Sequence, residues 1–555
     1  MNILEGEITY FGYNNKYGFI QSDIINDRIF FSTEREFASL HVNDRVRFEL
    51  KKSTEGKYQA INIATIETFA DRIKTKYGLT EEINAKSILE SISKNWKLEA
   101  GLEKFKEYFY YNNELFDIIN NDKCYIIGRK GSGKSSISEY LLNIRDAKVF
   151  SQKLSFKNFP FNELYSFDNK KYTPPNQYIT IWKYLIYSHI AKLMVCNESI
   201  DSNVRSELAK IYSPDPINSL ARAVERWTQK SFGVEILGCG GSLAISKEYA
   251  NNEITWIERT NILEDIIVQY CDDSIYYIIF DELDEDYREF KTNDYQLYSY
   301  LITSLFKAVQ DVKKTFSTTS ISLKPLIFLR DDIYSLIKDA DKNKWRDFKI
   351  EIEWDLEKIK KMLSHRLSID AKAKTTIEFE DIFKLIFDLR NVKNVSPFDY
   401  ITKSTHMRPR DFIRYFQVCA DESLGRKNEL IRSETILYVD RAFSNYLRDE
   451  IVDEIFPLLP EIEEIFQIMS NIGKKEFKYT DFIREYNKYL VKNTVTEKNI
   501  DFILDTLFKF SVIGNKSRKD NKNAYFKYIH TNFNLVKDEI LVIHPGLYKV
   551  MQIPF

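Results

Sequence analysis

Short stretches of alternating polar and hydrophobic residues open the chain. Five such stretches occur between residues 6 and 64, with the sequences GEITYF, YGFIQS, DRIFFS, DRVRFEL and YQAINIA. Turn sequences such as GYNNK and STEGK separate them. A period of two places the hydrophobic side chains on one face of a strand. Residues 1–66 are therefore predicted to form a small β-barrel.

Apolar strands alternate with amphipathic helices from residue 118 to residue 372. The strands have the sequences CYII, IYYIIF, KPLIFLR and FKIEIEW, and helical patterns such as SSISEYLLNI and YQLYSYLITSLFKAVQDV follow two of them. This alternation predicts a doubly wound α/β domain with a parallel sheet, whose binding site lies at the carboxyl ends of the strands. Charged helical patterns on either side predict a connector at residues 67–117 and a helical lid at residues 373–450.

An insertion of about 100 residues, at about 150–255, interrupts this central domain. It contains a long helical pattern, YITIWKYLIYSHIAKLMV, in which Trp182, Leu185, Ile186 and Leu193 form the expected core face. It also contains the glycine-rich stretch FGVEILGCGGSLAISKE, which predicts a hairpin. The GCGG within it is predicted to be a turn, because no helix beginning with Lys-Ser or Lys-Thr follows.

The last hundred residues, 451–555, combine three helical patterns with a hairpin pattern. The helices have the sequences EIEEIFQIM, YTDFIREYNKYL and NIDFILDTLFKFSVI, and the stretch GNKSRKDNKNAYFKYIH follows. Three helices followed by a turn and a β-hairpin resemble a winged helix. The hairpin tip carries Lys516, Arg518, Lys519 and Lys522, a basic cluster suited to phosphate contacts, or a solvated wing that packs against a protein.

Composition narrows the protein class. Lys and Arg number 80 against 82 Asp and Glu, giving a net charge of -2, so a nucleic-acid site would have to be a local patch. The 44% hydrophobic and 29% charged fractions are those of a globular chain. No secretory leader or bilayer-length apolar run is found, and the five cysteines are scattered. We expect a cytoplasmic protein with reduced thiols and no membrane contact.

The most specific motif lies at residues 128–135, GRKGSGKS, which satisfies GxxxxGK[ST] between a predicted strand and a predicted helix. Backbone N–H groups of such a loop close around phosphates at a helix N-terminus. Lys134 is expected to reach the β- and γ-phosphates of ATP, and the Ser135 hydroxyl to ligate Mg²⁺. The predicted nucleotide contacts are Gly128, Arg129, Lys130, Gly131, Ser132, Gly133, Lys134, Ser135 and Ser136.

A second acidic motif follows the apolar strand IYYIIF. Asp281 is expected to hold Mg²⁺, and Glu282 to orient and deprotonate the attacking water. The alternative is a buried strand that runs into a solvated acidic loop, although an Asp-Glu pair directly after four apolar residues makes this less favourable. Together the two motifs predict an ATPase that converts ATP and water to ADP and phosphate.

Arginines further along the chain resemble the sensor groups of AAA-type ATPases. Arg330 ends the strand PLIFLR, and an arginine there resembles the STAND branch of these enzymes. The stretch HMRPRDFIRYFQ resembles the sensor 2 helix of the lid, with Arg408 or Arg410 facing the γ-phosphate. A guanidinium suits that role because it contacts phosphate oxygens through two N–H groups. Surface arginines on a helix that begins with proline are the alternative, and an arginine acting from another subunit cannot be located.

The N-terminal segment resembles a cold-shock domain, a five-stranded OB-fold. The resemblance extends over residues 6–11, 16–20, 29–32, 44–49 and 59–62. In that family, exposed aromatic side chains stack on the bases of single-stranded RNA or DNA. Carried over, the resemblance implies nucleic-acid contacts from Tyr10, Lys16, Tyr17, Phe19 and Phe30. The alternative is that these rings belong to the barrel core, as alternation requires for about half of the aromatic side chains.

Together, the order of domains resembles the ORC/STAND-like P-loop ATPases of bacterial defence systems. That resemblance implies a switch that binds ATP and Mg²⁺, forms a homo-oligomer, senses nucleic acid or a protein partner, and acts through a separate effector in antiphage defence. A regulator or RNA chaperone with a structural, weakly active ATP site is the alternative. The sequence leaves open the activating ligand, the choice between RNA and DNA, and the subunit count.

Overall fold

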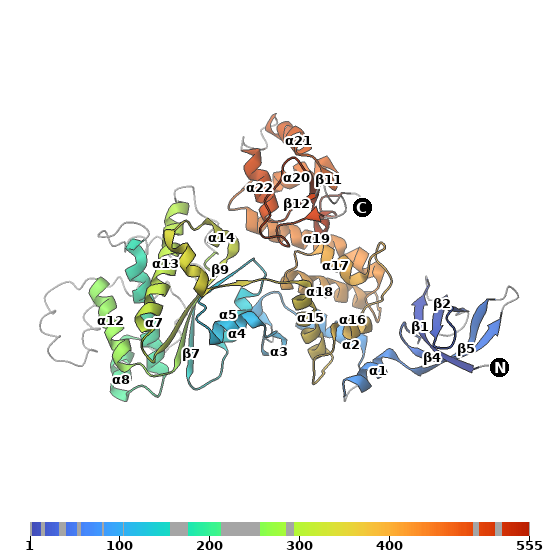
Figure 1. The fold of residues 1–555 in the computed structure, drawn as a ribbon, viewed down its shortest axis with the longest axis horizontal. Helices are drawn as coiled ribbons and strands as arrows, with labels where there is room; N and C mark the ends of the chain where they lie inside the picture. Colours follow the sequence, from blue (N-terminus) through green and yellow to red (C-terminus); the bar gives the residue numbers. More distant parts are fainter. Residues whose placement is uncertain are drawn as a thin grey trace. The chain divides into compact units, whose positions relative to one another are not determined.

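The structure is a computed structural model, and it describes most of the chain. The described residues are 3–12, 17–32, 40–52, 57–79, 83–103, 105–155, 176–212, 256–284, 294–491, 495, 499–516 and 524–553. The chain forms two compact units. Figure 1 shows their helices and strands as a ribbon. The first contains residues 1–110, 354–455 and 461–555, and the second contains residues 111–353 and 456–460.

The N-terminal strands close into the predicted barrel. They are β1 (Ile3–Phe11), β2 (Tyr17–Ser22), β3 (Ile29–Ser32), β4 (Arg45–Lys52) and β5 (Tyr58–Glu67), in the order β1-β2-β3-β5-β4. The strands pair antiparallel except β3 with β5. Alternating side chains fill the interior, among them Ile8, Phe11, Ile20, Ile29 and Phe31. The five-stranded barrel predicted from hydrophobic alternation is confirmed.

Helices form most of the rest of the first unit. They are α1 (Phe69–Lys76), α2 (Ala85–Asn95), η2 (Ala100–Leu102), α3 (Phe105–Tyr108), α15 (Leu356–Asp370), α16 (Phe379–Ile386), α17 (Pro397–Ser404), α18 (Pro409–Gly425) and α19 (Ser433–Ile455). Several begin as the sequence favours: α17 starts with Pro397 after Ser396, whose hydroxyl accepts the Asp399 N–H.

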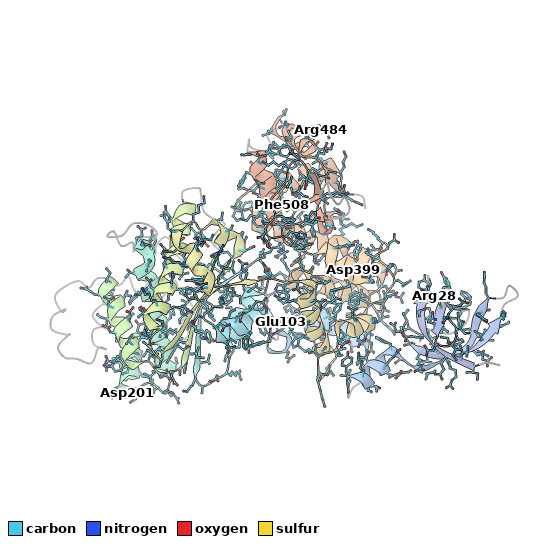
Figure 2. All side chains as sticks on the ribbon, in the orientation of Figure 1. Arg28, Glu103, Asp201, Asp399, Arg484 and Phe508 are labelled. Atoms are coloured by element: carbon cyan, nitrogen blue, oxygen red, sulfur yellow. The ribbon has the colours of Figure 1, made fainter. Side chains whose placement is uncertain are left out.

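Helix α2 packs against α15, α16 and α18 within this unit. The buried Trp96 indole donates to Asp370 Oδ2 at 2.8 Å, and the Tyr108 hydroxyl donates to Asp370 Oδ1 at 2.6 Å. Arg366 pairs with Glu103, which Figure 2 labels. Buried polar groups that have hydrogen-bond partners restrict how two surfaces can pack. This network therefore ties the segment after the barrel to α15 of the same unit.

A five-stranded sheet forms the centre of the second unit. Its strands are β6 (Tyr125–Gly128), β7 (Val149–Ser155), β8 (Ile275–Asp281), β9 (Ser322–Arg330) and β10 (Lys349–Ile352), in the order β10-β6-β9-β8-β7. All four pairings are parallel, as predicted. The strand β7, inside the region assigned to the insertion, was not predicted. The carboxyl ends of these strands meet at one edge of the sheet.

Helices connect and cover these strands. They are α4 (Asn113–Asn120), α5 (Lys134–Leu142), η3 (Asn176–Tyr178), α7 (Ile179–Cys196), α8 (Ser202–Ile211), α12 (Trp256–Tyr270), α13 (Asp294–Phe316), α14 (Asp331–Leu336) and η6 (Ala340–Phe348). All four residues of the predicted core face of α7 are buried, and so are Tyr184 and Tyr187, because α12 and α13 also pack on this helix. The predicted hairpin at residues 232–248 lies outside the described residues.

The C-terminal segment combines three helices and a four-stranded sheet. The elements are α20 (Ile462–Ile472), β11 (Glu476–Phe477), α21 (Tyr479–Val491), α22 (Ile500–Lys509), β12 (Ile513–Lys516), β13 (Ala524–Tyr525), β14 (Ile540–Ile543) and η7 (Pro545–Leu547), and the strand order is β11-β14-β12-β13. The predicted hairpin corresponds to β12 and β13, whereas β11 and β14 were not predicted. Helix α22 ends earlier than predicted, because Ser511 has φ of 58° and Ile513 pairs with Ile543.

Membrane-spanning helices, metal-binding clusters and disulfide bonds were sought among the described residues. Over the ranges given above, no helix is long and apolar enough to cross a membrane. Within the same ranges, no group of three or more His, Cys, Asp and Glu side chains could hold a metal ion. Cys124, Cys196, Cys271 and Cys419 are free thiols.

Candidate nucleotide-binding site

The glycine-rich loop connects the end of β6 to the start of α5. Gly131 and Gly133 have φ of 77° and 94°, a left-handed conformation that favours glycine. Gly128 ends the strand where space is short: a Cβ there would lie 2.6 Å from Ser132 Oγ and 3.2 Å from Ile352 Cβ. The loop can therefore approach the sheet closely and present its backbone at the N-terminus of α5, where the helix dipole favours an anion.

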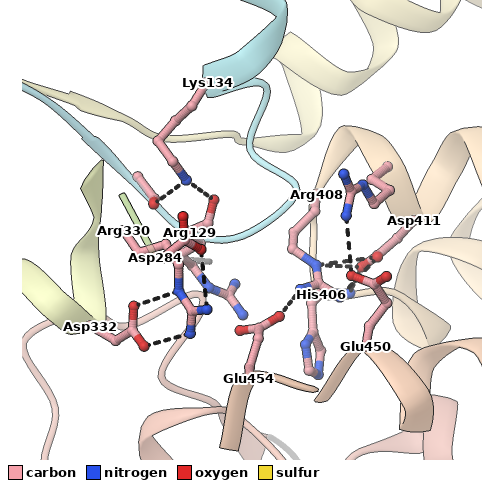
Figure 3. Close-up of polar contacts among 12 residues, drawn as sticks. Arg129, Lys134, Asp284, Arg330, Asp332, His406, Arg408, Asp411, Glu450 and Glu454 are labelled. Carbon is pink, nitrogen blue, oxygen red and sulfur yellow. Dashed lines mark hydrogen bonds and ion pairs between the residues drawn. The ribbon is translucent and has the colours of Figure 1, made fainter. Parts of the chain in front are cut away.

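Lys134 is the first residue of α5, and its ammonium group lies against the loop. Its Nζ donates to the carbonyl oxygens of Gly128 at 2.8 Å and Arg129 at 3.0 Å (Figure 3). Burial lowers the pKa of Lys134, while the nearby carboxylates of Asp284 and Asp281 act in the opposite direction. Lys134 and the acid at the end of β8 are therefore electrostatic neighbours, as expected for two parts of one site.

Strand register brings the other predicted groups to the same edge. Gly128 of β6 lies opposite Arg330 of β9, and Ser155 of β7 lies opposite Asp281 of β8. Because the strands are parallel and in register, their last residues share the carboxyl edge of the sheet. Ser135 is exposed on the first turn of α5 at the same edge. The structure thus brings together residues that are 147 positions apart in the chain, since 281 − 134 = 147.

The acidic pair at the end of β8 has an unusual backbone. Asp281 is buried, and its Oδ1 accepts the Glu282 N–H at 2.9 Å. Glu282 has φ of 61°, a left-handed conformation that costs a non-glycine residue about 1–3 kcal/mol. Such strain occurs often at functional sites. The Glu282 carboxylate accepts a hydrogen bond from the Ser155 hydroxyl, so its direction is set from the neighbouring strand.

Lys153 is a residue of this site that sequence analysis did not identify. Its Nζ lies 3.1 Å from Asp281 Oδ2, 3.4 Å from Glu282 Oε1 and 3.5 Å from Glu139 Oε1. Burial disfavours the ammonium form, but Asp281 and Glu282 outweigh it and raise the pKa of Lys153. A cation therefore balances the acidic pair. In the sequence, Lys153 is a polar residue of a weakly alternating stretch, residues 149–155, and this is the only feature that could have indicated its place on a strand.

Arg330, the predicted sensor on β9, is fixed by carboxylates. Its Nε and Nη2 donate to the two oxygens of Asp332 at 3.0 and 2.7 Å, and its Nη1 donates to Asp284 at 3.4 Å (Figure 3). The side chain is buried at the carboxyl edge of the sheet. Arg330 therefore lies at the same edge of the sheet as the glycine-rich loop, where a sensor of the bound nucleotide is expected. Its sensor role stays a prediction.

Arg408 and Arg410, the two sensor candidates of the lid, differ sharply in their surroundings. Arg408 is 2% exposed, and its guanidinium donates to Asp411 at 3.1 Å and to Glu454 at 2.7 Å (Figure 3). Arg410 is half-buried and pairs with Glu450 at 3.3 Å. Arg408 thereby joins α18 to α19. Both sensor roles stay predictions.

We expect Arg408→Ala to destabilise the first unit by about 3–5 kcal/mol, because it leaves two buried carboxylates without their cation. Arg410→Ala is the matched control and should cost about 1 kcal/mol or less, because its pair is partly solvated. Urea denaturation followed by tryptophan fluorescence would measure both. Equal stability of the two variants would contradict this structural role of Arg408.

Four aromatic side chains form a continuous patch outside the barrel core. The ring centroids of Tyr17 and Phe30 are 6.0 Å apart and stacked, and those of Tyr10 and Phe19 are also 6.0 Å apart. Tyr10 and Tyr17 are each 38% exposed. None of the four belongs to the buried cluster of the barrel, so the core alternative does not hold for them. Lys16 lies outside the described residues.

The basic residues of the C-terminal hairpin are only partly described. Lys516, in β12, pairs with Glu476 of β11 at 2.7 Å, which neutralises its charge. Arg518, Lys519 and Lys522 lie outside the described residues. The phosphate-contact role of this cluster stays a prediction.

The glycine-rich loop and the parallel sheet are typical of P-loop nucleotide-binding proteins. Residues 357–452, which include the lid helices, match a family described as the FunZ-associated C-terminal helical domain. No curated protein matches the sequence.

Solved structures that match include a Cdc6p and an ORC. The crystal structure of Cdc6p from Pyrobaculum aerophilum is 10% identical, with coverage of 78% of this chain and 86% of its own and a TM-score of 0.26. The structure of Drosophila ORC bound to DNA is 11% identical, with coverage of 88% and 92% and a TM-score of 0.20. These scores are low, so the class rests on this chain's own loop and sheet.

Proposed function

We propose that the protein is an ATP-binding and ATP-hydrolysing switch that couples nucleotide state to the sensing of nucleic acid or a partner. One observation carries the proposal. The glycine-rich loop with Lys134 and the acidic pair Asp281–Glu282 occupy the same edge of one parallel sheet. A loop that binds phosphate beside carboxylates that can activate water is the arrangement that phosphoryl transfer to water requires.

The residues at this edge fit a nucleotide and its metal. The open space beside Gly133, where an added Cβ would have no atom within 4 Å, and the N-terminus of α5 suit phosphate oxygens. Ser135 and Asp281 would hold Mg²⁺, which neutralises charge on the phosphates when bound. Lys134 would exchange the two carbonyl oxygens that it now contacts for phosphate oxygens, which are stronger acceptors for an ammonium group.

Glu282 is the proposed general base. Its carboxylate is held by Ser155 and Lys153, which orient it at the end of β8. To accept a proton from water it needs one oxygen lone pair directed at the site, and a carboxylate offers about four. Lys153 also balances the charge of the acidic pair before a cation reaches it.

The same contacts favour the second candidate function, a regulator with a structural, weakly active ATP site. If Ser155 and Lys153 keep Glu282 engaged, ATP would bind and turn over slowly. A phosphate-release assay with and without single-stranded RNA separates the two functions. Release that rises with RNA supports the switch, and no release under either condition supports the structural site.

The aromatic patch on the barrel supports a nucleic-acid partner. Stacking on aromatic side chains is tolerant of sequence because every base has a π-face. The four rings lie on adjacent strands β1, β2 and β3, with neighbouring centroids about 6 Å apart, which suits successive bases of a single strand. The proposal has three further parts, which rest on the order of domains. The C-terminal domain binds DNA or a protein, the chain forms a homo-oligomer, and a separate effector acts with it in antiphage defence.

We expect Tyr17→Ala and Phe30→Ala each to weaken binding of single-stranded RNA or DNA by about 5- to 150-fold, because stacking contributes about 1–3 kcal/mol per base. Fluorescence anisotropy with labelled oligouridine and oligothymidine would measure this and would rank RNA against DNA. Ile24→Ala is the control, since Ile24 is an exposed apolar side chain of the barrel outside the patch. Unchanged affinity in both aromatic variants would exclude the patch as the binding surface.

A further inference from the structure

A cavity of about 590 Å³ lies in the second unit, at the edge of the sheet opposite the glycine-rich loop. It is lined by residues 121–124 before β6, by residues 310, 313, 314, 316 and 317 at the end of α13, by residues 321–324 and 326 at the start of β9, and by Phe348. The strands β6 and β9 begin at this edge, whereas the nucleotide loop follows the carboxyl end of β6. The cavity is therefore distinct from the candidate nucleotide site, and its volume is in the range of small-molecule sites.

Its charge is strongly one-sided. Four lysines line it, namely Lys123, Lys313, Lys314 and Lys324, and Asp122 is the one carboxylate among its described lining residues. The Asp122 side chain pairs with Lys313 at 3.3 Å, but it is 89% exposed, so solvent screens this ion pair. Burial and the neighbouring charge of Lys313 both lower the pKa of Lys324. Four lysines thus share one lining carboxylate, so positive charge is in excess in this cavity.

The lysine contacts leave donors available. Lys324 Nζ donates to the Ile119 carbonyl, Lys313 Nζ donates to the Asp122 carbonyl at 2.7 Å, and Lys123 Nζ donates to the Asp347 carbonyl at 2.9 Å. Ile119 lies in the last turn of α4, where a cation is favourable. That accounts for one lysine at this position. It does not account for four, each with three N–H donors.

Part of the remaining wall of the cavity is apolar. Phe316, Ile321 and Leu323 are buried side chains of this wall, and Phe348 is half-buried beside them. Lys313 Nζ lies 5.2 Å from the centroid of the Phe348 ring, so the cationic and aromatic surfaces adjoin. A ligand that contacts both the lysines and the apolar side chains would carry an anionic group next to an apolar or planar group.

We propose that this cavity binds a phosphorylated small molecule of mononucleotide size. Its phosphate contacts Lys324, Lys313 and Lys314, and its planar body packs against the wall that contains Phe316 and Phe348. The inference is independent of the proposed ATPase activity, because none of these residues belongs to the glycine-rich loop or the acidic pair. Such a site lets a second metabolite act on the sheet that positions the nucleotide loop.

The test uses Lys134→Ala full-length protein, in which the glycine-rich loop has lost its lysine. Inorganic phosphate and adenosine monophosphate are titrated separately by isothermal calorimetry. Both should bind saturably, with adenosine monophosphate at least about fivefold tighter because its base can stack. Adding Lys324→Ala should weaken both ligands at least about tenfold through the loss of a charge-assisted hydrogen bond. Adding Lys314→Ala, an exposed change that leaves the core intact, should weaken them about two- to fivefold.

Lys344→Ala is the control for net charge, since Lys344 is 70% exposed in the same unit and does not line the cavity. It should leave both affinities unchanged. The proposal is overturned if neither ligand binds saturably, or if the Lys324 and Lys314 variants bind as tightly as their parent. Equal affinities for phosphate and adenosine monophosphate would overturn the role of the apolar wall.

Discussion

Replacing Lys134 by alanine is expected to weaken ATP binding by at least about 100-fold, because two charge-assisted hydrogen bonds to the phosphates are lost. The ammonium group already lies at the loop, 2.8 Å from the Gly128 carbonyl oxygen, so it needs only a small movement to reach a phosphate. Alanine offers neither the charge nor the donors. Calorimetry or a fluorescent ATP analogue in the presence of Mg²⁺ would measure the change.

Lys148→Ala is the matched control for this variant. Lys148 is an exposed lysine of the same unit that pairs with Asp273 at 2.9 Å. Its removal changes the net charge by the same amount and should leave ATP affinity unchanged. Tight ATP binding by Lys134→Ala would contradict the assignment of the loop, and with it the proposed switch.

Glu282→Gln is expected to retain ATP binding and to lower phosphate release by at least about 100-fold. The amide keeps the size of the side chain and a hydrogen bond with Ser155, but it cannot accept a proton from water. General bases contribute about 10²–10⁴ in rate, which sets the size of the expected loss. Single-turnover phosphate release and ATP affinity, measured on the same sample, separate chemistry from binding.

Glu264→Gln is a close control for the loss of the Glu282 carboxylate. Glu264 is a half-buried carboxylate of α12 that also contacts a lysine and a hydroxyl, Lys183 at 3.1 Å and Tyr187 at 2.6 Å. It should leave phosphate release within about threefold of the parent. If Glu282→Gln releases phosphate at the parent rate, the assignment of the base is wrong and the structural ATP site becomes the better interpretation.

Local sequence was sufficient for the barrel, for four of the five strands of the parallel sheet and for the glycine-rich loop. Alternation with period two determines which side of each barrel strand is buried, and the structure has five strands where five were predicted. The loop depends on contiguous residues, and its left-handed positions are glycines 131 and 133. Such features need no distant partner, which is why sequence alone could identify them.

Distant pairings were beyond the reach of sequence. Strand β7 has a weak pattern, so neither the strand nor the contact of Lys153 with Asp281 was predicted. The short strand β11 exists because it pairs with β14 at residues 476–477 and 541–542, and β14 in turn pairs with β12. An arginine that begins a lid helix reads the same in sequence whether it faces a ligand or a buried carboxylate.

The sequence by itself determined the β-barrel and the glycine-rich loop of a P-loop-type sheet. It also indicated which aromatic and basic side chains could contact a ligand. All of these features depend on the spacing of residues that are close together in the chain. The tertiary structure alone decided which charges meet. Arg408 pairs with Glu454, and Lys153 pairs with Asp281 of the acidic pair. Four lysines line one cavity. The physical reason is that electrostatic partners are set by distance through space, and strand order brings together residues that are far apart in the chain.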